Sequence, residues 1–177
     1  MKKCFSRFSF FPIFLSFFLF SVEVLEAAAS REVLLNLTIE AIAGLEETFE
    51  SKTSSLTGKV MLGKDSVYRA DLLEVDLTSL NSGMETRDSH MRDKYLKTQD
   101  FPKALLKNLS AKNGTFEAML TLKGVEKKVL GTYQVKGKEV TAVFNVKISD
   151  YPIENPKFMT MKVKDSVEVK VRLDVDN

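Results

Sequence analysis

The chain has 177 residues, and its 26 Lys and Arg against 24 Asp and Glu give a formal net charge of +2. This near balance does not favour a nucleic-acid binder, whose basic residues would gather on one face, so we expect no nucleic-acid partner. The single cysteine, Cys4, excludes an internal disulfide and a metal site built from several cysteines.

Residues 1–29 have the pattern of a secretory signal peptide. Lys2, Lys3 and Arg7 precede an apolar run from Phe8 to Phe20, and small residues follow at 27–29. The run of about 13 residues is shorter than the roughly 18–20 that span a bilayer. An uncleaved membrane anchor is the alternative, because apolar residues continue beyond the run. We expect cleavage, which leaves one domain of residues 30–177, free of cysteine and periplasmic or secreted.

Alternating apolar and polar residues dominate this domain, as in half-buried antiparallel strands. Apolar alternation runs through residues 33–41, 56–62, 68–77, 116–122, 125–135, 140–148 and 167–175. In the third run the apolar face changes at Leu72-Leu73, which predicts a β-bulge. Short turns at Lys112-Asn113-Gly114 and Lys136-Gly137-Lys138 predict hairpins. Seven or eight strands would then form a meander that closes into a barrel or splits into a sandwich.

One segment, residues 82–102, interrupts the strand pattern. Ser82 and Glu85 have the spacing of a capping box, and Pro102 cannot continue a helix. One helical stripe is formed by Met84, Asp88, Met91 and Tyr95. We predict a single helix of about three turns at about residues 84–97, inserted between two strands.

Arg87, Asp88 and His90 form the densest polar group of the domain. In a structural interpretation, Asp88 lies on a packing face and needs a partner, for which Arg92 is four residues away. In a functional interpretation, the group binds a polar head group at the mouth of a cavity, with Arg87 as donor to an anion and His90 as hydrogen-bond partner.

Catalysis and metal binding are not expected from this group. His90 is the only histidine, so no site with several histidines exists. Ser89 adjoins His90 and Asp88, but neighbours on a helix point in different directions, which argues against a catalytic triad. We predict no enzyme activity, metal or cofactor.

Aromatic residues supply further candidates for a binding site. Phe101 precedes Pro102 and could line a pocket entrance, although anchoring of a loop is the simpler interpretation. Tyr68, Phe116 and Phe144 lie in strand runs and would face either a cavity or a packed core. A barrel of about eight strands is wide enough to hold a small ligand, so we include all four in the predicted site with Arg87, Asp88 and His90.

The helical segment also resembles the central signature of the YceI-like family. The matching motifs are Ser79-Leu80-Asn81-Ser82-Gly83, Arg87-Asp88-Ser89-His90 and Phe101-Pro102. LTLKGVEKKV at residues 120–129 and VKDSVEVKVRLDV at 163–175 are similar to strand patterns of the same family.

This resemblance implies an all-β fold, an antiparallel, extended, lipocalin-like β-barrel with one short inserted helix. It also implies an exported protein of the bacterial periplasm or secreted fraction that holds a polyisoprenoid or similar amphiphilic lipid in an apolar cavity. The alternative is a secreted structural or stress-related barrel with a filled interior and no ligand. We expect no membrane-spanning segment after the signal, and leave contact with a membrane surface and formation of a homodimer open.

Overall fold

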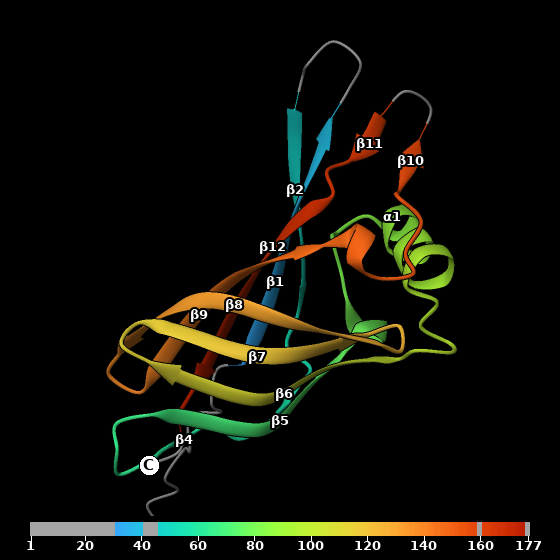
Figure 1. Cartoon of the computed structure of the whole chain (residues 1–177). Coiled ribbons are helices and arrows are strands. Elements are labelled where there is room, and N and C mark those ends of the chain that lie inside the picture. Colours follow the sequence, from blue (N-terminus) through green and yellow to red (C-terminus); the bar gives the residue numbers. More distant parts are fainter. Residues whose placement is uncertain (1–30, 41–45, 159–160, 176–177) are drawn as a thin grey trace, which may run out of the picture.

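A computed structural model describes residues 31–40, 46–158 and 161–175 of the chain. Within them, a strongly curled antiparallel sheet of twelve strand segments is accompanied by one short helical segment at one end (Figure 1). The predicted all-β barrel fold with one inserted helix is confirmed. In the described part of the chain, no helix is long and apolar enough to cross a bilayer. The predicted signal peptide lies outside the described residues.

The first strand brings together the two terminal parts of the described chain. β1 (Glu32–Glu40) pairs on one side with β2 (Glu46–Thr53) and on the other with β12 (Ser166–Asp174) and β11 (Met161–Val163). β11 forms a hairpin with β10 (Lys157–Phe158). In Figure 1, β2, β10 and β11 lie at the same end of the molecule as the helix.

From β12 the sheet continues in reverse chain order. The successive strands are β9 (Glu139–Lys147), β8 (Val125–Lys136), β7 (Thr115–Leu122), β6 (Lys103–Lys112) and β5 (Tyr68–Asp76). The other edge of β5 pairs with β3 (Leu56–Gly58) and β4 (Met61–Leu62). Because β2 and β3 belong to one run of chain and pair with β1 and β5 respectively, this run joins the two ends of the curled sheet.

Tight turns connect the central strands. Asn113 and Gly114 have φ of 54° and 80°, the left-handed conformations that a two-residue hairpin turn requires. Gly137 has φ of 65°. Both hairpins predicted from the sequence are confirmed, and Lys123-Gly124 forms a third such turn between β7 and β8, with φ of 49° and 77°.

The predicted change of face in β5 is present. Ala70 and Leu73 are buried, whereas Leu72 is exposed. Along β6, β5 keeps one register, but on its other edge three β5 residues between Arg69 and Leu73 face only two residues between Gly58 and Met61. This extra residue lies next to the predicted bulge at Leu72-Leu73. A second irregularity lies in β6, where Asn108 has φ of 51° and the register against β7 shifts between Lys107 and Ser110.

Helical structure occurs in the predicted segment and in two single turns. α1 (Glu85–Ser89) continues directly into η2 (His90–Leu96), a π-helical segment that ends at Lys97 in the left-handed conformation. The predicted helix at about 84–97 is therefore confirmed. The single turns are η1 (Leu77–Ser79) and η3 (Ile148–Asp150).

The end of the barrel away from the helix has a filled interior. Phe116 packs edge-to-face on Phe144, and Tyr68 packs on Tyr133, each with ring centroids 5.7 Å apart. Gly131 makes room for one of these rings, because a Cβ atom at this position would lie 2.5 Å from Cε1 of Phe116. We call this part, with the buried side chains around Phe116, the filled end.

Candidate ligand-binding cavity

The end of the barrel next to the helix is hollow. A cavity of about 610 Å³ lies there, within the range of small-molecule binding sites. Inward-facing side chains of the strands form most of its wall, among them Val33, Leu35, Leu37, Leu120, Leu122, Val146, Val169 and Val171. We call this part the hollow end.

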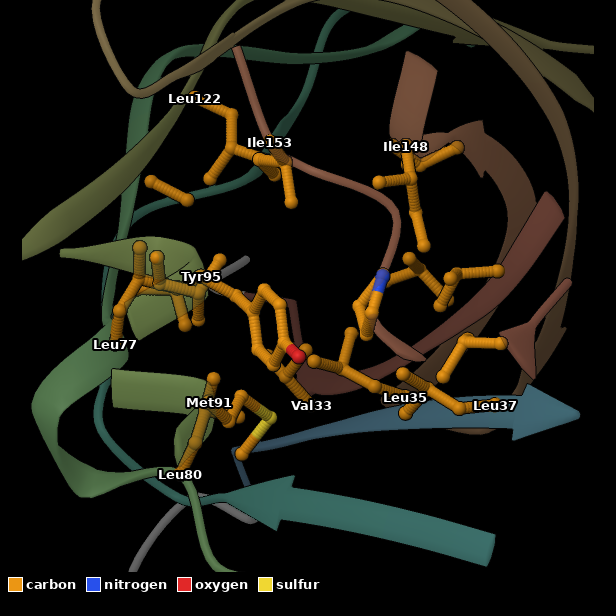
Figure 2. A pocket seen from close by; sticks show the side chains of 18 of the residues that line it. Val33, Leu35, Leu37, Leu77, Leu80, Met91, Tyr95, Leu122, Ile148 and Ile153 are labelled. Atoms are coloured by element: carbon orange, nitrogen blue, oxygen red, sulfur yellow. The ribbon is translucent and has the colours of Figure 1, made fainter. Parts of the chain in front are cut away.

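The helical segment and a loop cover the hollow end. Met91 and Tyr95 of η2 line the cavity from one side, and Ile153 of the loop before β10 lines it from another. Figure 2 shows the ring of Tyr95 reaching into the cavity, with its hydroxyl oxygen on the side of Val33 and Leu35. A polar atom is thereby placed among largely apolar side chains.

Asp88 fastens the helix to the turn before it. Its side chain is only 2% exposed, and one carboxylate oxygen accepts hydrogen bonds from the amide of Ser82 at 2.9 Å and from the Ser82 hydroxyl at 2.6 Å. Two predictions are therefore wrong. Ser82 does not cap the helix, which begins after Met84, and Arg92 pairs with Glu85 at 2.8 Å instead of with Asp88.

Arg87 and His90 lie at the mouth of the cavity, and both contribute to its lining. The guanidinium carbon of Arg87 lies 4.1 Å from the ring centroid of Phe49 in β2, which is a cation–π contact. This contact joins the helix to the β1–β2 hairpin across the mouth. Because Phe49 covers the face of the guanidinium, the N–H groups along its edge are the ones available to a ligand.

Lys123 ties the helix to the covering loop. The side chain is buried at the β7–β8 turn, and Nζ donates hydrogen bonds to the carbonyl oxygens of Tyr95 at 2.9 Å and Pro152 at 2.6 Å. Burial lowers the pKa of Lys123, and the nearby charge of Lys97 acts in the same direction. One side chain thus holds together two of the segments that close the cavity.

A second polar contact fixes the single turn η3, whose Ile148 also lines the cavity. The amide and hydroxyl of Ser149 donate hydrogen bonds of 2.8 and 2.7 Å to the two carboxylate oxygens of Asp165. These bonds lower the pKa of Asp165 because they favour its charged form. The wall around Ile148 is therefore held by a charge-assisted pair of bonds.

The structure brings three of the predicted site residues to the cavity: Arg87, His90 and Phe144. The other four, Asp88, Phe101, Tyr68 and Phe116, are not among its lining residues. Tyr68 and Phe116 belong to the filled end, because each packs against another aromatic ring. Phe101 is exposed and lies beside the Lys123-Gly124 turn.

Several lining residues were not predicted as site residues. Tyr95 and Met91 were assigned to the helical stripe, and that stripe was the signal that could have identified them. Lys94 had no such signal, because its charge is typical of a solvated helix position. Ile153 had none either, because it lies in an irregular loop. Within the described residues, no cluster of three His, Cys, Asp or Glu side chains could hold a metal ion.

Solved structures share this fold. BcnA from Burkholderia cenocepacia aligns with a TM-score of 0.59 and 16% identity, over 80% of this chain and 96% of that chain. A polyisoprenoid binding domain from Saccharophagus degradans aligns with a TM-score of 0.54 and 18% identity, over 84% of this chain and 99% of that chain. The YCEI protein of Campylobacter jejuni aligns with a TM-score of 0.54 and 14% identity, over 72% of this chain and 84% of that chain. Such low identities establish the fold alone.

Sequence comparison assigns the family. No curated protein matches the chain significantly. The family model of the YceI-like domain, in contrast, matches residues 25–175. That match covers most of the chain and all the strands described above, so the protein belongs to the YceI-like family.

Proposed function

We propose that this protein is exported and that it binds a polyisoprenoid or similar amphiphilic lipid in the cavity of the hollow end. The observation that carries the proposal is the cavity itself, about 610 Å³ with a wall formed mostly by apolar side chains. Burial of apolar ligand surface against such a wall contributes about 25 cal/mol per Å². The Saccharophagus structure, named as a polyisoprenoid binding domain, agrees with this ligand class.

The chemistry at the site favours binding without a reaction. Asp88, the carboxylate nearest in sequence to His90, accepts its hydrogen bonds from Ser82. It is therefore engaged in holding the helix, which does not suit a residue that orients a catalytic base. We propose no enzymatic step and no cofactor.

The location follows from the N-terminal pattern. Residues 1–29 combine positive charge, an apolar run and small residues, as signal peptides do. We expect N-terminal sequencing of the protein from the host envelope to begin within a few residues of Ser30. A mature protein that still starts at Met1 would contradict export by a cleaved signal.

The ligand is tested by extracting lipid from the purified protein and by weighing the native complex in a mass spectrometer. We expect a stoichiometric lipid in the wild type and a reduced lipid content in Leu122→Trp, since Leu122 lines the cavity and the larger ring would project into the space that a tail occupies. Met119→Trp is the matched control, because Met119 lies on the same strand and does not line the cavity.

Two outcomes would contradict the proposal. One is a wild-type protein that is empty and takes up no prenyl lipid from vesicles. The other is a Leu122→Trp variant that folds and keeps its full lipid content. The ligand-free structural barrel would then be favoured, although its expected feature, an interior filled from end to end, is not what the described residues form.

A further inference from the structure

The mouth of the cavity carries an excess of positive charge. Its lining includes four cationic side chains, those of Arg87, Lys94, Lys157 and Lys162, and also His90. Glu47 is the only carboxylate among the described residues that line the cavity. An almost neutral chain therefore concentrates cations at the entrance to an apolar space, where a ligand head group would lie.

Two of these cations stand opposite each other in a hairpin. Lys157 of β10 and Lys162 of β11 are cross-strand partners, and like charges in this position destabilise a pair of strands. Within the described part of the chain, Lys157 makes no ion pair. Lys162 also lies opposite Glu40 of β1 in the register. Of the two lysines, we therefore assign only Lys157 to the ligand head group. The charge of Lys157 is therefore available to an anionic ligand at the entrance.

The other two cations come from the helical segment, Arg87 from α1 and Lys94 from η2. Arg87 is held over the ring of Phe49, so the edge of its guanidinium is oriented before any ligand arrives. The Nζ atom of Lys94 lies 5.2 Å from the ring centroid of Tyr95, the residue that reaches into the cavity in Figure 2. Cations from two separate elements thus converge on one opening.

We infer that the occupant of the cavity is an anionic amphiphile, with its carboxylate or phosphate head among Arg87, Lys94 and Lys157 and its apolar tail in the barrel. A cavity of about 610 Å³ has room for a long apolar tail. This inference rests on the proposed function and specifies its ligand class.

The test compares pairs of ligands that share a tail and differ only in head charge. Hexadecanoate is paired with hexadecanol, and geranylgeranyl phosphate with geranylgeraniol. Each competes against the neutral fluorescent probe N-phenyl-1-naphthylamine on the full protein at low salt. We expect at least one anion to bind about tenfold more tightly than its alcohol, since a charge-assisted hydrogen bond contributes about that factor. The two pairs distinguish a carboxylate head from a phosphate head.

The variants Lys94→Glu and Lys157→Glu should reduce the ratio of anion affinity to alcohol affinity toward one. Lys136→Glu is the control, because Lys136 is an exposed residue at the β8–β9 turn and does not line the cavity. Equal binding of anions and alcohols, or a preference that survives both charge reversals, would overturn the inference and leave the proposed function standing. Failure of the probe and of all four ligands to bind would overturn the proposed function as well.

Discussion

The filled and hollow ends of the barrel are made from the same strands but are closed in different ways. β9 contributes Val140 to the filled end and Val146 to the cavity wall. Paired aromatic rings occupy the filled end, whereas a helix and a loop, held by a few polar contacts, cover the hollow end. The comparison suggests that global stability resides mainly in the filled end and that local opening begins at the hollow end.

The largest expected effect comes from emptying the filled end. Phe116→Ala should lower the free energy of unfolding by about 3–5 kcal/mol, because it removes a buried ring and leaves a void. Leu37→Ala should cost clearly less, since Leu37 already borders the cavity and is only partly buried. Urea unfolding of ligand-free protein measures both. Equal costs would remove the distinction between the two ends.

Adding a methyl group to the filled end should also lower the free energy of unfolding. In Gly131→Ala the new methyl group would lie 2.5 Å from a carbon of the Phe116 ring and 2.5 Å from the carbonyl oxygen of Val143. We expect a loss of about 1–3 kcal/mol in unfolding free energy. The neighbouring exposed residue provides the control, and Thr132→Ala should stay within about 0.5 kcal/mol. A fully stable Gly131→Ala variant would show that the filled end yields more easily than its packing indicates.

The hold on the helix at the hollow end is tested at Asp88. Asp88→Ala removes the acceptor of two Ser82 hydrogen bonds and should cost about 1.5–3 kcal/mol, since one partner is charged. Ser89→Ala, one residue away, removes only a hydroxyl bond to the Thr86 carbonyl and should cost less. Thermal melting compares the two variants, and identical melting temperatures would count against the anchoring role of Asp88.

The smallest change in stability is expected from Lys123→Met. The loss of two hydrogen bonds is offset by removal of a buried charge, so the net cost near neutral pH should be about 1 kcal/mol or less. Hydrogen exchange of residues 90–96 should nevertheless accelerate, because Nζ no longer binds the Tyr95 carbonyl. Lys127→Met, at an exposed position, should leave this exchange unchanged.

The pH dependence of the same variant has a defined sign. The folded state lowers the pKa of Lys123, so the unfolded chain holds the proton more tightly and the wild type gains stability as pH rises. The gain is complete above the unfolded pKa of about 10.4 and is lost as pH falls through the folded value. The stability difference between wild type and Lys123→Met should therefore grow from pH 7 to 10. A constant or shrinking difference would argue against a buried, charged lysine.

Alternation of residue types predicted most of the fold but missed strands that lack it. β2, with the sequence EETFESKT, contains one apolar residue, Phe49. Its strand conformation is imposed by pairing with β1 along its whole length. The two-residue strand β10 is likewise too short for any periodic signal. Pairing with distant strands determines the conformation of such segments, and the local sequence does not reveal that pairing.

The candidate site was predictable only in part for a related reason. Periodicity identifies which side chains face inward, but not whether they meet one another or enclose a space. Phe116 in β7 and Phe144 in β9 lie in stretches with the same pattern, yet only Phe144 borders the cavity. Asp88 was assigned to Arg92 by helical spacing, whereas its partner Ser82 lies in a turn that folds back onto the helix. The opposed Lys157 and Lys162 required knowledge of the hairpin.

The pairing of β1 with β12 also determines when the molecule can fold. Asn36 donates a hydrogen bond to Glu168, 132 residues further along the chain, so the barrel cannot close until the last strand has been synthesised. Contacts between such distant segments make folding slow. β1 can pair with β2 as soon as both have been made, but its other edge stays open until β12 follows, so the closed barrel is a property of the completed chain alone.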